Sequence, residues 1–481
     1  MKGAFRMKGA FRMKEDRKVI HILIVMSVLF LSLVVYLTYF ELFVKDRIIT
    51  NSYNQRQWEA EEDTIRGRIL DKNGIVLADS PKTEDGWKRT YPHGSLYSHV
   101  IGYNSRTYGK SMLEASYNDY LLGSERGIFD FGNRDESGMR YGDDVYLTLD
   151  HELQKLASQL LGDRNGAVVA MNPKTGEILA LVSKPAFDPN EDKLSANWQA
   201  MVESEDAIFL PRATQGLYTP GSTYKTVISA GALENGMEDL VIEDKGTVTI
   251  DGKPFSNTGK KAYGKIDMKK ALAVSSNVFF SQVGVELGEN VLRSLADRFG
   301  LGKDIPFEIP VTKSRFPYDS MGKTDMASVA IGQGKLQVTP LHMAMITSCI
   351  ANNGVMMKPY MVSRVVSHDG DEIKVTEPSV LYNVMSTQTA GAIKLMMREV
   401  VKSGTGKSAA IEGVNVAGKT GSAENELTAE GEAKNHAWFI SFAPVENPKI
   451  AVAVILEYSG TTGGGSAAPI ARELMKAYLK K

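Results

Sequence analysis

The sequence predicts an α/β protein of the α+β type, in which an antiparallel sheet flanked by helices is preceded by a small extended module and one N-terminal transmembrane helix. Three observations lead to this prediction. A charge-free apolar run stands near the N-terminus, residues 84–142 are rich in Gly and Tyr, and strand patterns occur at both ends of residues 143–481 with helical patterns between them. The 481 residues, 43% of them hydrophobic, suffice for a large core.

The N-terminal apolar run predicts an uncleaved membrane anchor. From Val19 to Phe40 there are 22 residues whose only ionisable side chain is His21, enough for a helix that crosses the hydrocarbon core. Seven Lys and Arg residues precede it, against Glu15 and Asp16, which predicts a cytoplasmic N-terminus. No small-x-small cleavage site follows. We therefore expect a single-pass protein of the cell membrane, with its later domains outside the cytoplasm.

The rest of the chain divides by the character of its sequence. Residues 1–18, which repeat MKGAFR, are expected to form a cytoplasmic tail without regular structure, and residues 19–43 the anchor. Residues 44–142 are expected to form a stalk and a pedestal module, with a hairpin turning at KNG. Residues 143–481 form the main domain. Its predicted elements are a helix at HELQKLASQLLG, strands at AVVAM, EILALVS, HAWFISFAP and KIAVAVILEYSG, and a terminal helix at APIARELMKAYLKK.

Several functional classes are excluded by composition and context. A net charge of -1 gives no basic surface for nucleic acid. The single cysteine, Cys349, permits neither an intramolecular disulfide nor a thiolate metal cage. The stretch GVNVAGKT matches a phosphate-binding loop, but the polar residues after it have no helical pattern, and the predicted topology places it outside the cell. We therefore expect it to bind no nucleotide.

A candidate nucleophile lies in TPGSTYKTVISAGALENG. Ser222 and Lys225 are three residues apart, so a helix that starts after the Pro-Gly pair places both on one face. A lysine whose pKa is lowered enough to make it neutral can serve as the base for a serine that attacks a carbonyl. The alternative is that Ser222 caps the helix and Lys225 is solvated. The pattern is weak alone, because Ser320 and Lys323 also match it.

Two further motifs follow in order. Ser275 and Asn277, in AVSSNVFF, could relay a proton and orient a substrate carbonyl, although a helix or loop end is the more usual explanation of such a pattern. Lys419-Thr420-Gly421-Ser422 supplies a second cation and two hydroxyls, and as an edge strand it could pair with an extended peptide. A second Lys-Thr-Gly, at 174–176, follows a proline in a predicted hairpin turn. Ser-x-Asn also occurs at 195–197 and 52–54.

The three motifs, spaced 53 and 144 residues apart, resemble those of the penicillin-binding proteins, more narrowly the class B (monofunctional) peptidoglycan transpeptidases. The resemblance covers about residue 66 to the end. It extends to the segments RGRILDKNGIVLA, YPHGSLYSHVIGY, GAVVAMNPKTGEILALVSKPAFDPN, AIGQGKLQVTPLHMA, HAWFISFAPVENP and GGGSAAPIA. Ser422 departs from it, because threonine is commoner there.

The resemblance implies a serine-type D-Ala-D-Ala transpeptidase that cross-links peptidoglycan stem peptides through an acyl-enzyme and is acylated by β-lactams. It also implies a SEDS-type glycosyltransferase as partner, and neither a cofactor nor a metal. A D,D-carboxypeptidase, a β-lactamase-like enzyme and a catalytically silent cell-wall scaffold remain alternatives. The implied catalytic residues are Ser222, Lys225, Ser275, Asn277 and Lys419, and the implied substrate-binding residues are Thr420, Gly421 and Ser422.

Overall fold

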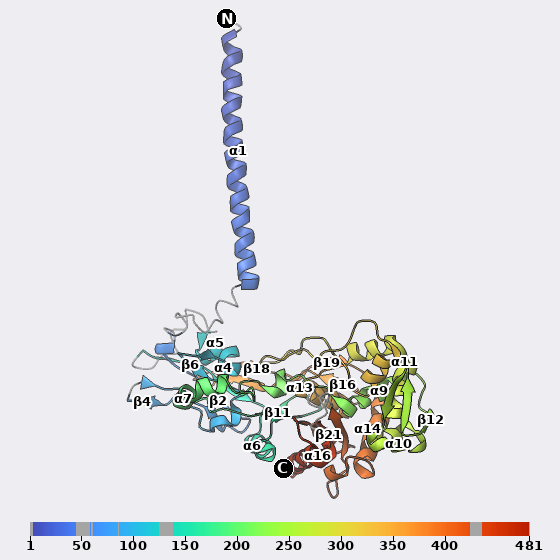
Figure 1. Cartoon of the computed structure of the whole chain (residues 1–481). Helices are drawn as coiled ribbons and strands as arrows, with labels where there is room; N and C mark the ends of the chain where they lie inside the picture. Colours follow the sequence, from blue (N-terminus) through green and yellow to red (C-terminus); the bar gives the residue numbers. More distant parts are fainter. Residues whose placement is uncertain are drawn as a thin grey trace. The chain divides into compact units, whose positions relative to one another are not determined.

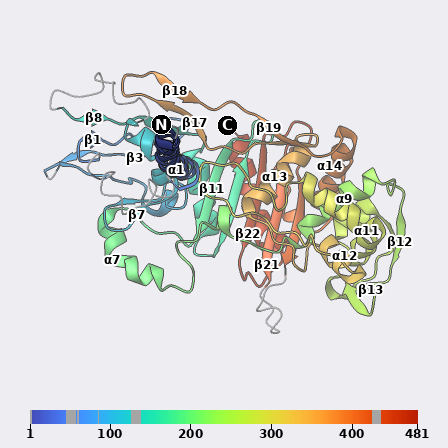
Figure 2. The same cartoon turned by 90° about the horizontal axis from the view of Figure 1, so that it is seen from above.

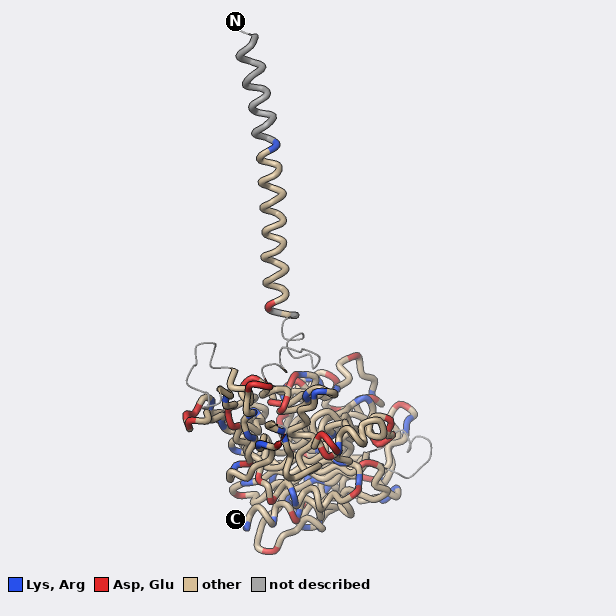
Figure 3. Tube along the Cα trace, turned by 90° about the vertical axis from the view of Figure 1, so that its left-hand side faces the viewer, with Lys and Arg blue, Asp and Glu red and all other residues tan. Residues whose placement is uncertain are grey.

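A computed structural model describes residues 3–44, 58, 61–84, 86–124, 138–423 and 435–480. Residues Met1–Glu62 and Arg106–Gly109 form one unit and the remaining residues a second unit. The first unit contains α1 (Gly3–Tyr39), which is followed by a π-helical turn, η1 (Phe40–Val44). Within α1, Lys18–Tyr39 is long and apolar enough to span a membrane, and Figure 3 shows no charged residue in this range after Lys18.

The expectation that the N-terminal tail lacks regular structure is wrong, because α1 begins at Gly3. The repeated MKGAFR segment and the residues after it include Ala, Met, Lys, Arg and Glu, which have high helix propensity. The anchor helix therefore continues without a break through residues that we had assigned to an unstructured tail.

The pedestal segment is built of short elements, as predicted. The hairpin that turns at KNG is confirmed, with β2 and β3 pairing antiparallel. Strand β1 pairs in parallel with β8. The elements are β1 (Thr64–Ile65), β2 (Ile69–Leu70), β3 (Val76–Ala78), β4 (Lys82–Thr83), β5 (Gly86–Trp87), η2 (Gly94–Tyr97), β6 (Asn104–Ser105), β7 (Gly109–Lys110), α4 (Met112–Ser116), α5 (Asn118–Leu121) and β8 (Arg140–Tyr141).

A five-stranded sheet joins this segment to the later chain. Its order is β18-β17-β9-β2-β3, with β9 (Asp144–Leu147), β17 (Val362–Val366) and β18 (Glu372–Val375). The β2 and β9 pair is parallel and the other pairs are antiparallel. The boundary that we predicted between residues 142 and 143 falls inside the second unit, and it stays a prediction.

The main sheet is antiparallel throughout, as predicted, with the order β11-β10-β22-β21-β20. The first two strands come from the beginning of the main domain and the other three from its end. β20, which carries the third motif, lies at one edge. The strands are β10 (Gly166–Met171), β11 (Ile178–Lys184), β20 (Ala417–Ala423), β21 (His436–Ala443) and β22 (Ile450–Leu456).

Helices cover both faces of this sheet (Figure 1). Alternate strand residues belong to different cores: Val168 packs with α6 (His151–Leu161) and α16 (Gly463–Leu479), whereas Val169 packs with α13 (Pro340–Ala351). Both α6 and the C-terminal helix were predicted, although α16 begins several residues earlier than expected. Burial on both faces explains why these strands read as continuous apolar runs rather than as alternating patterns.

A helical group lies on the β21 side of the sheet (Figure 2). It contains the helices after the first two motifs, together with small hairpins. The remaining elements of the chain are α7 (Glu191–Val202), α8 (Arg212–Gln215), η4 (Gly221–Tyr224), α9 (Lys225–Glu234), β12 (Val241–Asp244), β13 (Thr247–Ile250), β14 (Lys253–Ser256), η5 (Thr258–Lys260), β15 (Gly264–Asp267), α10 (Met268–Val274), α11 (Asn277–Arg298), α12 (Lys323–Ala330), β16 (Val355–Met357), β19 (Val380–Asn383), α14 (Thr387–Lys402) and η6 (Lys407–Ala409).

A buried charge cluster holds the pedestal segment together. The Glu114 carboxylate is fully buried, 2.7 Å from Nε of Arg66 and 2.6 Å from Nε of Arg89. The Tyr91 hydroxyl also donates to it. Burial opposes ionisation of Glu114, but the two arginines outweigh burial and hold its pKa below the usual range. One carboxylate therefore ties together the segments around residues 66, 89 and 114.

Removing this carboxylate charge should destabilise the fold strongly. Glu114→Gln removes the carboxylate charge that faces two buried guanidinium groups, and breaking such a buried ion pair costs about 3–5 kcal/mol. Urea denaturation of the detergent-solubilised chain, followed by tryptophan fluorescence, measures the loss. Asp297→Asn is the control, because its ion pair with Lys303 is exposed and such pairs contribute about 0–1 kcal/mol. Equal losses in the two variants would contradict the structural role of Glu114.

Candidate active site

The candidate nucleophile lies in a short turn that leads into a buried helix. Ser222 is the second residue of the 3-10 turn η4, and Lys225 is the first residue of α9. Ser222 is partly exposed, whereas Lys225 is fully buried. In the described part of the chain the Ser222 hydroxyl forms no hydrogen bond, and neither η4 nor α9 has a side-chain cap. The alternatives of a capping serine and a solvated lysine are therefore both wrong.

The Lys225 amine reaches the second motif. Its Nζ lies 2.8 Å from the Ser275 carbonyl oxygen, 2.7 Å from Oδ1 of Asn277 and 3.4 Å from the Ser275 hydroxyl. The Asn277 amide nitrogen donates in turn to the Ser256 carbonyl, at 2.8 Å. The fold thus brings Ser275 and Asn277, which lie 50 and 52 positions after Lys225 in the sequence, into direct contact with its amine.

The third motif reaches the same serine from the edge of the sheet. Lys419 is also fully buried, and its Nζ donates to the Ser275 hydroxyl at 2.9 Å and to the Thr420 carbonyl at 2.9 Å. The Ser275 hydroxyl therefore lies between two lysine amines, one from α9 and one from β20. The three motifs form one hydrogen-bonded network, which the first motif joins through Lys225. Ser222 lies three residues before Lys225, in the turn that leads into α9.

Both lysines have lowered pKa values. Burial, with a further contribution from the Lys419 charge, lowers the pKa of Lys225 well below the usual value, while the Asp244 charge opposes this effect. Burial lowers the pKa of Lys419 to about 7. The Lys419 charge disfavours a second charge on Lys225, so Lys225 is the lysine of the pair that loses its proton more readily.

The second motif marks the junction between two helices. Ser275 ends α10 in the left-handed conformation (φ 60°, ψ 40°), and Asn277 begins α11. Between them, the Ser276 hydroxyl accepts a hydrogen bond from the Phe279 N–H and caps α11. The helix-end explanation of the motif is thus correct, and it is compatible with function, because the sharp turn directs Ser275 and Asn277 towards Lys225.

The edge strand β20 packs against the turn that carries the nucleophile. A Cβ atom added to Gly421 would lie 3.0 Å from the Pro220 carbonyl oxygen and 2.9 Å from Cβ of Trp438. The Trp438 indole also donates to the Thr219 carbonyl, at 3.0 Å. Ser422 is exposed at this edge, while the Thr420 hydroxyl is buried against that of Thr405 at 2.6 Å. Gly421 therefore permits the close approach of strand and turn.

A glycine from the IGQG segment supports the turn from another direction. The Gly221 N–H donates to the Gly332 carbonyl, at 2.9 Å. Gly332 has φ +75°, and an added Cβ atom would lie 1.9 Å from the Gly221 carbonyl oxygen. This position combines a left-handed backbone with direct contact to the nucleophile turn, so only glycine fits it.

The competing motif copies do not join this network. Lys174 lies in the turn between β10 and β11, with its amine on Asn447, and residues 195–197 lie inside α7. The pair Ser320 and Lys323 lies at the start of α12. The copy at 52–54 falls outside the described residues. His436, for which the sequence identified no partner, accepts from the Tyr458 N–H and contacts the Tyr218 ring.

Sequence reasoning missed two buried residues beneath the second motif. Asp244 and Asn257 are 1% and 4% exposed, and they contact Ser276 and Asn277. Asp244 adjoins an exposed Glu243 in a short strand, and Asn257 follows a hairpin. No pattern in the sequence distinguishes them from the surrounding surface residues; only the folded chain does.

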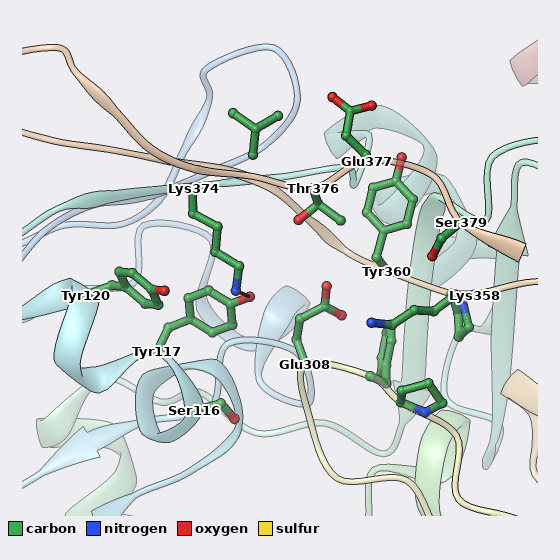
Figure 4. Close-up of a pocket in the computed structure, with 14 residues that line it drawn as sticks. Ser116, Tyr117, Tyr120, Glu308, Lys358, Tyr360, Lys374, Thr376, Glu377 and Ser379 are labelled. Carbon is green, nitrogen blue, oxygen red and sulfur yellow. Dashed lines mark hydrogen bonds between the residues drawn. The ribbon is translucent and has the colours of Figure 1, made fainter. Parts of the chain in front are cut away.

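A separate cavity of about 560 Å³ lies away from these motifs. It is lined by residues of α4, α5 and β18 and by the segments around Glu308 and Tyr360 (Figure 4). The Lys374 amine donates to the Tyr117 hydroxyl there, and Glu308 accepts from the backbone N–H groups of Met361 and Val362. No motif residue lines this cavity, and the described residues contain no cluster of metal-ligating side chains.

Comparisons with known proteins agree with this geometry. The family model of the penicillin binding protein transpeptidase domain matches residues 166–476, and that of the penicillin binding protein A dimerisation domain matches residues 66–131. The peptidoglycan D,D-transpeptidase PbpA of Mycobacterium tuberculosis is 33% identical over 489 residues, which cover 94% of this chain and 98% of PbpA.

Two solved structures are similar over 87% of this chain. The D,D-transpeptidase domain of a peptidoglycan glycosyltransferase from Eggerthella lenta has a TM-score of 0.78 and 36% identity over 99% of its length. The ceftriaxone acyl-enzyme complex of penicillin-binding protein A from M. tuberculosis has a TM-score of 0.81 and 32% identity over 99% of its length. The chain therefore belongs to the penicillin-binding proteins, and among them to the class B transpeptidases.

Proposed function

We propose that the chain is a membrane-anchored peptidoglycan D,D-transpeptidase with Ser222 as its nucleophile. The observation that carries this proposal is the buried network in which the Ser275 hydroxyl lies between the amines of Lys225 and Lys419, with Lys225 at the start of the helix that follows the Ser222 turn. Its relatives named peptidoglycan D,D-transpeptidase, and solved acyl-enzyme complexes of the same fold, support the same chemistry. Ser222, Lys225, Ser275, Asn277 and Lys419 are the proposed catalytic residues.

The hydrogen bonds around Lys225 suit a neutral base. A neutral amine has two N–H groups and one lone pair. The Ser275 carbonyl and Oδ1 of Asn277, at 2.8 and 2.7 Å, accept the two N–H groups. The lone pair is then available for the proton of Ser222. An ammonium would have to leave its third N–H towards the weaker contact at 3.4 Å.

The proposed reaction has two halves, acylation of Ser222 and transfer of the acyl group to an amine, and each half forms one acyl bond and breaks another. Oγ of Ser222 attacks the carbonyl carbon of the penultimate D-alanine, and Lys225 takes the hydroxyl proton. The proton passes through the Ser275 hydroxyl to the amine of the terminal D-alanine, which leaves as the C–N bond breaks. An amine of a second stem peptide then attacks the ester, and its proton returns Ser222 to the hydroxyl form. The N–H groups of Ser222 and Ser422 are the proposed oxyanion donors, commonly worth about 3–4 kcal/mol each.

The edge strand β20 is the proposed peptide-binding surface. An extended stem peptide can pair with the free edge formed by Thr420, Gly421 and Ser422. Lys419 donates to the Ser275 hydroxyl and the Thr420 carbonyl at 2.9 Å and makes a longer contact of 3.5 Å with the Thr420 hydroxyl, so the third N–H of its ammonium form can turn to the terminal carboxylate of the peptide. β-Lactams, which carry a similar carboxylate beside an acylating carbonyl, are the proposed inhibitors.

The apolar segment of α1 is proposed to cross the cell membrane once, with the N-terminus in the cytoplasm. Single-cysteine labelling of a Cys349→Ser chain, at position 10 or position 95, tests this topology with a membrane-impermeant maleimide. Labelling from outside should reach only position 95. A SEDS-type glycosyltransferase is the proposed partner, and its co-purification should be lost when residues 19–43 are replaced by an unrelated membrane helix.

Intact-mass measurement tests the acyl-enzyme directly. The detergent-solubilised chain should gain the mass of one benzylpenicillin on Ser222 and lose it slowly, because a transpeptidase transfers its acyl group to an amine rather than to water. Ser222→Ala should gain nothing. Ser320→Ala, the serine of the unused Ser-x-x-Lys pattern, should react like the parent.

The same experiment separates the alternatives. An unmodified but folded parent would favour a silent scaffold, and rapid turnover of the drug a β-lactamase. A D-Ala-D-Ala peptide supplied with a labelled acceptor amine then separates the two remaining activities. Transfer of the amine supports the transpeptidase, whereas hydrolysis without transfer indicates a D,D-carboxypeptidase.

The pH profile of acylation should be bell-shaped. The rate rises as the base loses its proton and falls as Lys419, with a pKa of about 7 in the free enzyme, loses the charge that binds the carboxylate. In Lys419→Gln the alkaline limb should disappear. The acid limb should move to higher pH, since the charge that lowers the pKa of Lys225 is gone. An acid limb that stays in place would contradict the coupling of the two lysines.

A further inference from the structure

Asp244 is a buried carboxylate that belongs to none of the three motifs. It is the last residue of β12 and is 1% exposed. Its Oδ1 accepts from the Gly246 N–H and from Nδ2 of Asn257, both at 2.8 Å, and its Oδ2 accepts from the Ser276 hydroxyl at 2.5 Å and from Nδ2 of Asn257 at 2.9 Å. Both oxygens of the Asp244 carboxylate thus act as hydrogen-bond acceptors.

The partners of Asp244 are the residues that hold the second motif in place. Ser276 lies between Ser275 and Asn277, and its hydroxyl caps α11 while it donates to Asp244. Oδ1 of Asn257 accepts from the Asn277 N–H at 2.8 Å and from the Val278 N–H at 3.2 Å. Asp244 therefore holds the helix junction through two contacts. It accepts from the Ser276 side chain directly, and through Asn257 it reaches the backbone N–H of Asn277.

We infer that Asp244 is a positioning residue of the acyl-transfer site, which holds Ser275 and Asn277 against Lys225 through Ser276 and Asn257 and supplies the negative charge that faces the buried amine. The inference rests on the proposed function, because it assigns Lys225 as the base. Asp244 acts through its neighbours and touches neither substrate nor the reacting atoms.

The charge of Asp244 opposes the two effects that make Lys225 neutral. Burial and Lys419 lower the pKa of Lys225, whereas Asp244 raises it. Around Asp244 the titratable groups with which it interacts are Lys225, from α9, and Tyr263, from the segment before β15. Lys245 and Lys261 flank the site in sequence, and the carbonyl of Lys261 accepts from Asn257. Asp244 therefore keeps the basicity of Lys225 high enough to accept the Ser222 proton.

Asp244→Asn tests the inference, because it keeps the shape of the side chain and removes its charge. Acylation of the detergent-solubilised full chain by a fluorescent penicillin is followed across the pH range in which the parent stays folded. Without the opposing charge the pKa of Lys225 falls further, so the acid limb of the acylation rate should move to lower pH by about 1 unit. The plateau rate should fall about 10-fold or more, because the amine and the serine lose their alignment.

Glu243→Gln is the matched control. Glu243 is the neighbouring residue of the same strand, it carries the same charge, and it is exposed. Its pH profile should coincide with that of the parent. An acid limb that moves only in Asp244→Asn supports the inference. An unmoved limb overturns it even if the plateau falls, because a purely structural residue lowers the rate without moving the limb.

A second variant keeps the test decisive if Asp244→Asn does not fold or its acid limb lies below the accessible range. Ser276→Ala removes the link from Asp244 to the junction and also the cap of α11. Ser386→Ala removes a comparable cap, that of α14, and nothing at the junction. Acylation at the plateau should fall about 10-fold in Ser276→Ala alone. Equal rates in the two variants overturn the inference.

Failure of the inference and failure of the proposed function give different results. If the parent chain is not acylated at Ser222, the proposed function fails before any variant is compared. If the parent is acylated and Asp244→Asn has the parent's acid limb, the function stands and Asp244 is only a buried structural residue.

Discussion

The structure around the active site depends on the burial of two lysine amines on either side of one hydroxyl group. Lys225 and Lys419 are both fully buried, and both contact the Ser275 hydroxyl. Two ammonium groups so close together and so far from water would repel each other strongly. The two lysines together therefore bind fewer protons than two exposed lysines would. In the proposed mechanism the neutral amine, that of Lys225, is the base.

Such a pair requires acceptors that are placed before the substrate arrives. A buried amine without partners costs free energy, so three separate elements must deliver carbonyl and amide oxygens to these two groups. The helix junction between α10 and α11 does so with Ser275 in a left-handed conformation that non-glycine residues rarely adopt. Gly332 and Gly421 allow the nucleophile turn to approach its neighbours closely. The hydrogen bonds, the strained backbone of Ser275 and the two glycines together hold the motif residues in contact with one another.

Whether a part of the structure could be predicted depends on whether it leaves a pattern within one segment of the sequence or arises from contacts between distant segments. The main sheet could be predicted because Gly166–Met171 and Ile450–Leu456 are buried on both faces and read as apolar runs. The motif residues could be predicted because the three motifs, in this order and spacing, resemble those of a known family, although each motif alone is weak. The contact of Asp244 with Ser276, 32 residues away, leaves no periodic trace, and neither does the joining of β2 to β9 in the second sheet. The helical tail was missed because residues 1–18 show no apolar helical period, and helix propensity alone is a weak signal.

The charges of the site also allow the carboxylate of a bound substrate to affect the protonation of the two lysines. Asp244 raises the pKa of Lys225, whereas burial and the Lys419 charge lower it. In the proposed mechanism the carboxylate of a stem peptide adds a negative charge beside Lys419 and raises the pKa of that lysine, so Lys419 keeps its proton. A protonated Lys419 disfavours a second charge on Lys225, which leaves Lys225 able to accept the proton of Ser222. Binding of the peptide carboxylate and readiness of the proposed base would thus be coupled through the Ser275 hydroxyl, and a ligand without that carboxylate would lack this support for a charged Lys419.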